Sequence, residues 1–210
     1  MTYSLEELAQ DLNVSRETSV KLQTYADLLI KWQKAKNLVS NSTLDDIWRR
    51  HFLDSAQMIP HIQAVFGEKR LSLLDIGSGA GFPGLVLSLA GVAHAHMVES
   101  NGRKCIFMRQ VVRDTAALAE IHNERIESIG VFPVDIITSR ACARVIQLIN
   151  WSKPFLEASG GKAEIWLLKG AGADEELTEA KACWKMQVDR YSSLSDPSGV
   201  ILRLHGIESL

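Results

Sequence analysis

The chain has 210 residues, of which 46% are hydrophobic and 23% are charged, and its formal net charge is −2. This length allows one domain of ordinary size with a small appendage, and the composition excludes a disordered chain. The 23 basic and 25 acidic residues exclude a uniformly basic nucleic-acid coat, but they leave open a basic patch on one face.

Cysteine usage and the N-terminal residues indicate the compartment. Cys105, Cys142 and Cys183 are widely spaced, and no Cys-x-x-Cys pair or Cys/His cluster has zinc spacing. We therefore expect neither a disulfide framework nor a metal site, and the remaining histidines offer no case for ligation. Residues 1–10 contain early acids and no long apolar run. We expect a cytoplasmic protein without a signal peptide or a membrane span.

Residues 1–65 predict a helical region. The motif Ser4-Leu5-Glu6-Glu7 has the spacing of a capping box at a helix start. Apolar residues recur at intervals of three and four over residues 15–36, which predicts an amphipathic helix. A third helix is expected over residues 43–58, and Pro60 should close it or begin a short turn.

After Leu71 the pattern alternates between strands and helices. The expected strands are residues 71–76, 94–99, 119–123, 134–139, 163–168, 185–191 and 200–205, and the expected helices are residues 85–90, 103–119, 144–156 and 174–183. Such alternation predicts an α/β fold with a mostly parallel, seven-stranded sheet covered on both faces. The last two strands flank a turn and predict an antiparallel edge. We expect a helical extension over residues 1–65 and a main domain over residues 66–210.

The segment from Leu73 to Gly84, LLDIGSGAGFPG, predicts a ligand-binding loop between a strand and a helix. Glycines allow sharp turns and a close approach of the backbone to a ligand, and a proline suits the first turn of a helix. Gly79, Gly81 and Gly84 also fit the G-x-G-x-x-G pattern of dinucleotide sites, which alone is a weak signal.

Two acidic residues bear on the choice of cofactor. Asp75 lies two residues before the first glycine, where a carboxylate would repel a pyrophosphate but would favour the sulfonium and ammonium of S-adenosylmethionine. Glu99 ends the next strand, where it can accept hydrogen bonds from ribose hydroxyls of either cofactor. Asp75 therefore favours S-adenosylmethionine over a nicotinamide dinucleotide.

The chain as a whole resembles the bacterial small-subunit rRNA guanine-N7 methyltransferases, also called glucose-inhibited division protein B. The landmarks are Lys31-Trp32-Gln33-Lys34, Asn37-Leu38, Arg50-His51-Phe52-Leu53-Asp54-Ser55, the loop Asp75–Gly84 with its Phe-Pro-Gly, and Ser139-Arg140-Ala141. Gln33 departs from the family pattern, in which asparagine follows the tryptophan. Residues 184–210 carry no recognisable signature.

The resemblance implies a Rossmann-like class I S-adenosylmethionine-dependent methyltransferase with an N-terminal helical extension. It places family cofactor contacts at Gly77, Phe82, Ile126, Glu127 and Arg140, where they would supply an apolar wall and an acceptor for adenine and a cation for the methionine carboxylate. Together with the loop and strand-end residues, the expected cofactor-binding set is Asp75, Gly77, Gly79, Gly81, Phe82, Glu99, Ile126, Glu127 and Arg140.

The implied substrate is a guanine in 16S rRNA, within the small ribosomal subunit or an assembly intermediate. Guanine N7 carries a lone pair and no proton, so no residue is assigned as a general base. Arg140, Lys169 and His51 are candidates for positioning, and Asp54 is expected to cap a helix or pair with Arg50. Two basic clusters could contact RNA or simply form solvated helix faces: Lys31, Lys34, Lys36, Arg49 and Arg50, and Arg103, Lys104, Arg109 and Arg113.

Three other functions stay open on the residues alone. The glycine loop also suits a nucleotide-dependent oxidoreductase, although Asp75 opposes it. A non-catalytic binding module could retain the same fold. A methyltransferase could also act on a substrate other than RNA, because only the family resemblance selects rRNA and N7.

Overall fold

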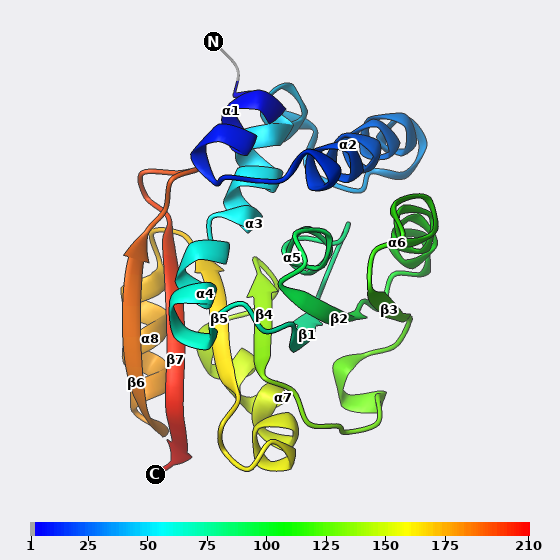
Figure 1. Cartoon of the computed structure of the whole chain (residues 1–210). Coiled ribbons are helices and arrows are strands. Elements are labelled where there is room, and N and C mark those ends of the chain that lie inside the picture. The colour runs from blue at the N-terminus through cyan, green and yellow to red at the C-terminus, as the bar shows by residue number, and fades with distance from the viewer. Residues whose placement is uncertain (1–2) are drawn as a thin grey trace.

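In the computed structural model, which describes residues 3–210, seven strands form one sheet (Figure 1). Their order is β3-β2-β1-β4-β5-β7-β6, with β1 to β5 parallel and β7 antiparallel to both of its neighbours. The strands are β1 Leu71–Ile76, β2 Ala93–Val98, β3 Ala119–His122, β4 Ile136–Arg140, β5 Glu164–Lys169, β6 Trp184–Ser192 and β7 Val200–Ser209. The predicted α/β class and antiparallel edge are confirmed.

Eight α-helices accompany the sheet within the described residues. They are α1 Leu5–Asp11, α2 Arg16–Lys36, α3 Asp54–Ala56, α4 Ile59–Phe66, α5 Gly84–Leu89, α6 Gly102–Thr115, α7 Val145–Ala158 and α8 Ala173–Lys181. The capping box at α1 is confirmed: the Glu7 amide donates to Ser4 Oγ at 3.2 Å, and the Ser4 amide donates to the Glu7 carboxylate at 2.8 Å. Across residues 3–210, no helix is both long and apolar enough to traverse a bilayer.

Alternation along the buried strands divides the core into two layers. On β1, Leu71 and Leu73 pack in the layer that contains α2, α4, α5 and α6, whereas Leu74 and Ile76 pack in the layer that contains α7 and α8. A parallel strand covered on both faces must be apolar on both, which explains the near-continuous hydrophobic run of β1. The N-terminal helices thus share one core layer with the sheet.

The segment predicted as a helix over residues 43–58 is helical, but it is not one regular α-helix. The chain instead forms a 3₁₀ turn at Asn41–Asp46, a π-helical turn at Trp48–Leu53 and the short α3. Single π-helical turns are rare and occur often at functional sites. His51 and Asp54 within this segment bind Arg140 at the end of β4, so tertiary contacts accompany the departure from a regular α-helix. Pro60 lies in the first turn of α4 and begins a helix instead of closing one.

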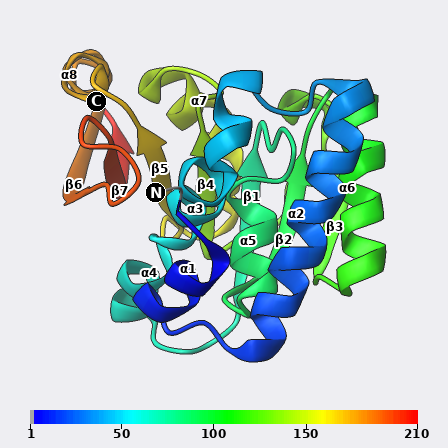
Figure 2. The ribbon, with the colours of Figure 1, turned by 90° about the horizontal axis from the view of Figure 1, so that it is seen from above.

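Tyr25 of α2 connects the helical region to the glycine loop. Its hydroxyl donates to the Ala80 carbonyl at 2.5 Å, and its ring stacks on Phe82 with centroids 5.1 Å apart. Phe52 meets both rings edge-on. A Cβ at Gly81 would lie 2.6 Å from the tyrosine oxygen. Figure 2 shows α2 lying over α5 and alongside α6, so this helix fixes the loop from above.

We expect Tyr25→Phe to destabilise the protein by about 1–3 kcal/mol, because it leaves the buried Ala80 carbonyl without its donor. Urea unfolding followed by circular dichroism measures this change. Tyr191→Phe is the matched control, since the Tyr191 ring is only partly buried against the core. Equal stability of the Tyr25 variant and the unmodified protein would contradict the assigned role of this hydrogen bond.

Candidate functional site

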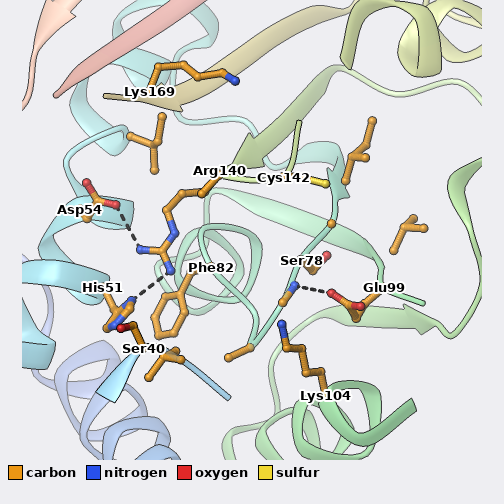
Figure 3. Close-up of a pocket in the computed structure, with 18 of the residues that line it drawn as sticks. Ser40, His51, Asp54, Ser78, Phe82, Glu99, Lys104, Arg140, Cys142 and Lys169 are labelled. Atoms are coloured by element: carbon orange, nitrogen blue, oxygen red, sulfur yellow. Dashed lines mark hydrogen bonds and ion pairs between the residues drawn. The ribbon is translucent and has the colours of Figure 1, made fainter. Parts of the chain in front are cut away.

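A cleft opens at the carboxyl ends of the parallel strands, where the chain order reverses between β1 and β4 (Figure 3). Open α/β sheets bind their ligands at this switch point. Its volume of about 660 Å³ lies in the range typical of small-molecule sites. The walls come from the glycine loop, the ends of β2, β4 and β5, and segments from both ends of the chain.

The glycine loop forms the floor with backbone that only glycine adopts easily. Gly77 and Gly79 have φ of +68° and +59°, and a Cβ on Gly77 would lie 2.2 Å from the Cys142 sulfur. The amides of Gly77 and Ser78 both donate to the Val98 carbonyl at 3.0 Å. The loop is therefore fastened to β2, and Gly77 and Gly79 add no side chain of their own to the cleft.

Glu99 carries an acceptor into the cleft from the end of β2. One carboxylate oxygen accepts from the Gly79 amide at 2.9 Å, and the other accepts from the Asn101 amide at 2.7 Å. Each carboxylate oxygen can accept a second bond, so the side chain is oriented and still able to bind hydroxyls. This geometry fits the expected role of Glu99 toward a nucleoside.

Asp75 lies beneath the loop and does not line the cleft. Its carboxylate is fully buried, and Thr138 Oγ1 donates to one of its oxygens at 2.7 Å. The other oxygen has no partner among residues 3–210. Burial raises the pKa of Asp75 to about 6. Gly81 is also covered, under Tyr25 and Leu85. The expectation that Asp75 and Gly81 touch the cofactor directly therefore needs correction. Asp75 lies beneath the loop, and Gly81 is a loop residue that Tyr25 and Leu85 cover.

Arg140 is held at the end of β4 by groups from the N-terminal region. One terminal nitrogen donates to Asp54 Oδ2 and to the Arg50 carbonyl, both at 3.1 Å, and the other lies 3.0 Å from His51 Nδ1. The guanidinium also sits over the Phe82 ring, 4.9 Å from its centroid. The expected pairing of Asp54 with Arg50 is wrong, because Asp54 binds Arg140 and Arg50 binds Asp196 at 3.0 Å.

His51 is a neutral imidazole in this arrangement. Burial, together with the positive charges of Arg140 and Arg50, lowers its pKa to about 3. Because Arg140 can only donate, Nδ1 of His51 must accept, and Nε2 must carry the proton toward Thr43 Oγ1 at 2.8 Å. His51 thus fixes the orientation of Arg140 instead of exchanging protons near neutral pH.

Ile126, Glu127 and Lys169 also line the cleft, but the two charged side chains already bind other groups of the protein. Ile126 is buried in the wall, and the Glu127 carboxylate accepts from Trp151 Nε1 at 2.9 Å. Lys169 is almost covered, and its ammonium donates to Glu176 at 2.8 Å and to the Ala143 carbonyl. Its charge is therefore compensated within the protein, which weakens the case for substrate positioning.

Two wall segments were missed by sequence reasoning. Residues 38–40 and residues 193–199 both contribute to the cleft, although they lie near opposite ends of the chain. Gln57 accepts from the Leu194 amide at 2.6 Å, and Ser195 Oγ donates to Asp54 at 2.6 Å, which ties the β6–β7 connection to the helical region. The only signal in the sequence was the turn composition of Asp196–Gly199.

Comparison with known proteins identifies the family. The family model described as "GidB: rRNA small subunit methyltransferase G" matches residues 18–200. The chain belongs to this family. A ribosomal RNA small subunit methyltransferase G of Rhodospirillum rubrum is 48% identical over 199 residues, covering 95% of this chain and 96% of the relative. One of Paramagnetospirillum magneticum is 46% identical over 202 residues, covering 96% and 95%.

Solved structures confirm the fold. Magnesium protoporphyrin IX methyltransferase of Synechocystis, with bound S-adenosylmethionine, has a TM-score of 0.55 at 12% identity and covers 87% of this chain and 97% of that one. A ribosomal protein L11 methylase of Lactobacillus delbrueckii has a TM-score of 0.56 at 11% identity, covering 72% and 77%. The family and the Rossmann-like class predicted from the sequence are both confirmed. The predicted activity, that of an S-adenosylmethionine-dependent methyltransferase, is confirmed with them.

The low pKa of His51 predicts an acid-dependent loss of stability. Between its ordinary pKa of 6.5 and its folded pKa of about 3, the unfolded chain binds the proton and the folded chain does not. Unfolding free energy therefore falls as pH drops through this window, by up to about 1.4 kcal/mol per pH unit.

Urea unfolding of the unmodified protein and of His51→Gln, repeated between pH 7 and pH 4.5, measures this effect. The difference between the two proteins should shrink steadily below pH 6.5. Asp75 titrates in the opposite sense, since its raised pKa costs stability as pH rises toward 6, but it is present in both proteins and cancels. Parallel curves would show that His51 titrates normally in the folded state.

Proposed function

We propose that this chain transfers a methyl group from S-adenosylmethionine to N7 of a guanine in 16S rRNA of the small ribosomal subunit or its assembly intermediate. The observation that carries the proposal is the glycine loop in the cleft, with the Gly79 amide bonded to Glu99, in a chain that belongs to the rRNA small subunit methyltransferase G family. Its place of action is the cytoplasm, where small subunits are assembled.

The cleft residues fit the cofactor. Gly77 and Gly79 let the loop backbone approach it, Glu99 accepts from the ribose hydroxyls, and Ile126 forms an apolar wall for adenine. Arg140 offers a cation for the methionine carboxylate, although N–H groups of its guanidinium already bond to His51 and Asp54. When bound, the cofactor supplies an electrophilic methyl group on a cationic sulfur.

The protein's contribution to this chemistry is positioning. Guanine N7 attacks through an in-plane lone pair and loses no proton, so no general base is required. Consistent with this, neutral His51 is locked between Thr43 and Arg140. A rigid rim that holds the nucleophile in line with the methyl group supplies the main rate advantage. Residues 66–210 would form the methyltransferase domain, and residues 1–65 an extension that completes its wall.

A basic rim suits RNA. Lys31, Lys34 and Lys36 are exposed near the end of α2, Arg103 is exposed at the start of α6, and Lys104 lines the cleft. Trp32 and Phe107 pack with ring centroids 5.8 Å apart, so the two helices bring these charges together beside the cleft. Among residues 3–210, no ion pair within 4.0 Å compensates any of these five side chains. Phosphate binding is their expected use.

Cofactor binding is tested by titration calorimetry with S-adenosylmethionine and, separately, with NAD. We expect binding of the first alone, and we expect Glu99→Gln to weaken it about tenfold or more, since the loop loses a charge-assisted bond at Gly79. Glu208→Gln, which removes an exposed carboxylate beside Lys185, is the control. Preferential binding of NAD would overturn the proposal in favour of an oxidoreductase.

Methyl transfer is tested with small ribosomal subunits that lack the modification. After incubation with labelled cofactor, borohydride reduction and aniline cleavage should reveal a single N7-methylated guanine in 16S rRNA. Label in the protein fraction, or on another atom of the RNA, would contradict the assigned substrate. Naked 16S rRNA run in parallel distinguishes RNA from a ribonucleoprotein surface as the substrate.

The basic rim predicts a salt-dependent affinity for the subunit. Lys34→Ala combined with Lys104→Ala should weaken binding and reduce the slope of log affinity against log salt by about two, one for each lost phosphate contact. Lys181→Ala, an exposed lysine in the last turn of α8, is the control. An unchanged slope would place the RNA on another face.

A further inference from the structure

Three histidines and a glutamate gather on one face of β2 and β3, at the edge of the sheet. His94 and His96 are two residues apart on β2, so their side chains leave the same face. Glu120 on β3 lies directly opposite His96 in the strand register, and His122 follows it on the same face. Spacing along the sequence gave no sign of this cluster, because strand pairing creates it.

The ligand atoms of His94, His96 and Glu120 all lie within 4.8 Å of one another. His94 Nε2 is 3.4 Å from Glu120 Oε1, and His96 Nδ1 is 3.9 Å from Glu120 Oε2. Two ligands about 2.0–2.2 Å from a tetrahedral Zn²⁺ are themselves about 3.3–3.6 Å apart. The His94–Glu120 pair is already at this separation, whereas the other ligand atoms, which lie up to 4.8 Å apart, must move closer together to share one ion.

We propose that His94, His96 and Glu120 form a binding site for a divalent transition-metal ion on the β2–β3 edge. Two imidazole nitrogens and a carboxylate are a donor set suited to Zn²⁺ and related ions. His94 and Glu120 are exposed, so they can rotate toward a common centre, and the fourth position is open to water. The site is distinct from the cofactor cleft, since none of its three ligands lines that cleft.

The surroundings of His96 strengthen the proposal. Its side chain is only 17% exposed, and its ring packs against Phe132 with centroids 4.4 Å apart. Nδ1 of His96, the nitrogen that faces Glu120, also lies 3.2 Å from Nε2 of His122, so a bound ion would replace this histidine–histidine hydrogen bond. A partly buried imidazole that is already packed loses little side-chain freedom when it binds an ion.

A metal here would act as a clamp between strands. β3 has only four residues and forms the edge of the sheet, and residues 124–127, which follow it, line the cofactor cleft. A bond from β2 to β3 through the ion would restrain that part of the wall. This role is structural and does not depend on the methyl-transfer chemistry.

The test is titration calorimetry of tag-free protein with Zn²⁺ alone. We expect one equivalent to bind, with affinity at least about tenfold weaker in His94→Asn/His96→Asn and in Glu120→Gln, because loss of even an outer-shell partner costs a metal site 10–100-fold. His205→Asn is the matched control: His205 pairs with Asp189 at 3.3 Å elsewhere on the sheet and lacks a third ligand.

Thermal unfolding gives a second readout that needs no active enzyme. Zn²⁺ should raise the Tm of the unmodified protein and of His205→Asn, a chelator should reverse the rise, and the double variant should show none. Circular dichroism of each variant without metal establishes that it is folded. Zn²⁺ affinity that is equal in the double variant and the unmodified protein, or no saturable binding at all, would overturn the proposal.

Discussion

The contact on which the site depends is the one between Arg140 and the π-helical turn. The arginine leaves the end of a sheet strand, yet its guanidinium is held by the Asp54 carboxylate, the His51 ring and the Arg50 carbonyl, all from the N-terminal region. A partly buried charge needs partners that satisfy it. Here those partners also fix the distance between the helical region and the glycine loop, since the same guanidinium covers Phe82.

The helical region is therefore part of the site and not an attachment to it. Tyr25 binds the loop carbonyl from above, and Asp75 fills the space below, so the loop is fixed on two sides. Loops that bind cofactors need rigid support, because a small displacement of the binding groups costs much of the affinity. The glycines allow a ligand to approach the loop backbone, while the aromatic residues around the loop hold it rigid.

Local patterns in the sequence were enough for the fold and for most of the cleft. The alternation after Leu71 predicted the sheet, and the glycine loop with Glu99 predicted where a nucleoside would bind. The failures share one cause, which is tertiary contact. Residues 43–58 contain 3₁₀ and π-helical turns instead of one α-helix, and His51 within them binds Arg140 from a distant strand. Asp75 was placed in the cleft because strand position alone does not report which face a side chain takes. Strand pairing likewise brought His96 and Glu120 together without any motif.

Part of the cleft wall comes from within residues 38–54 and from residues 193–199, two segments that Gln57, Asp54 and Ser195 join. During synthesis the second of these segments leaves the ribosome long after the first. Domains fold largely as units during synthesis, with N-terminal parts ahead. The glycine loop is thus synthesised well before residues 193–199, and the full wall forms only when the β6–β7 connection docks on the helical region.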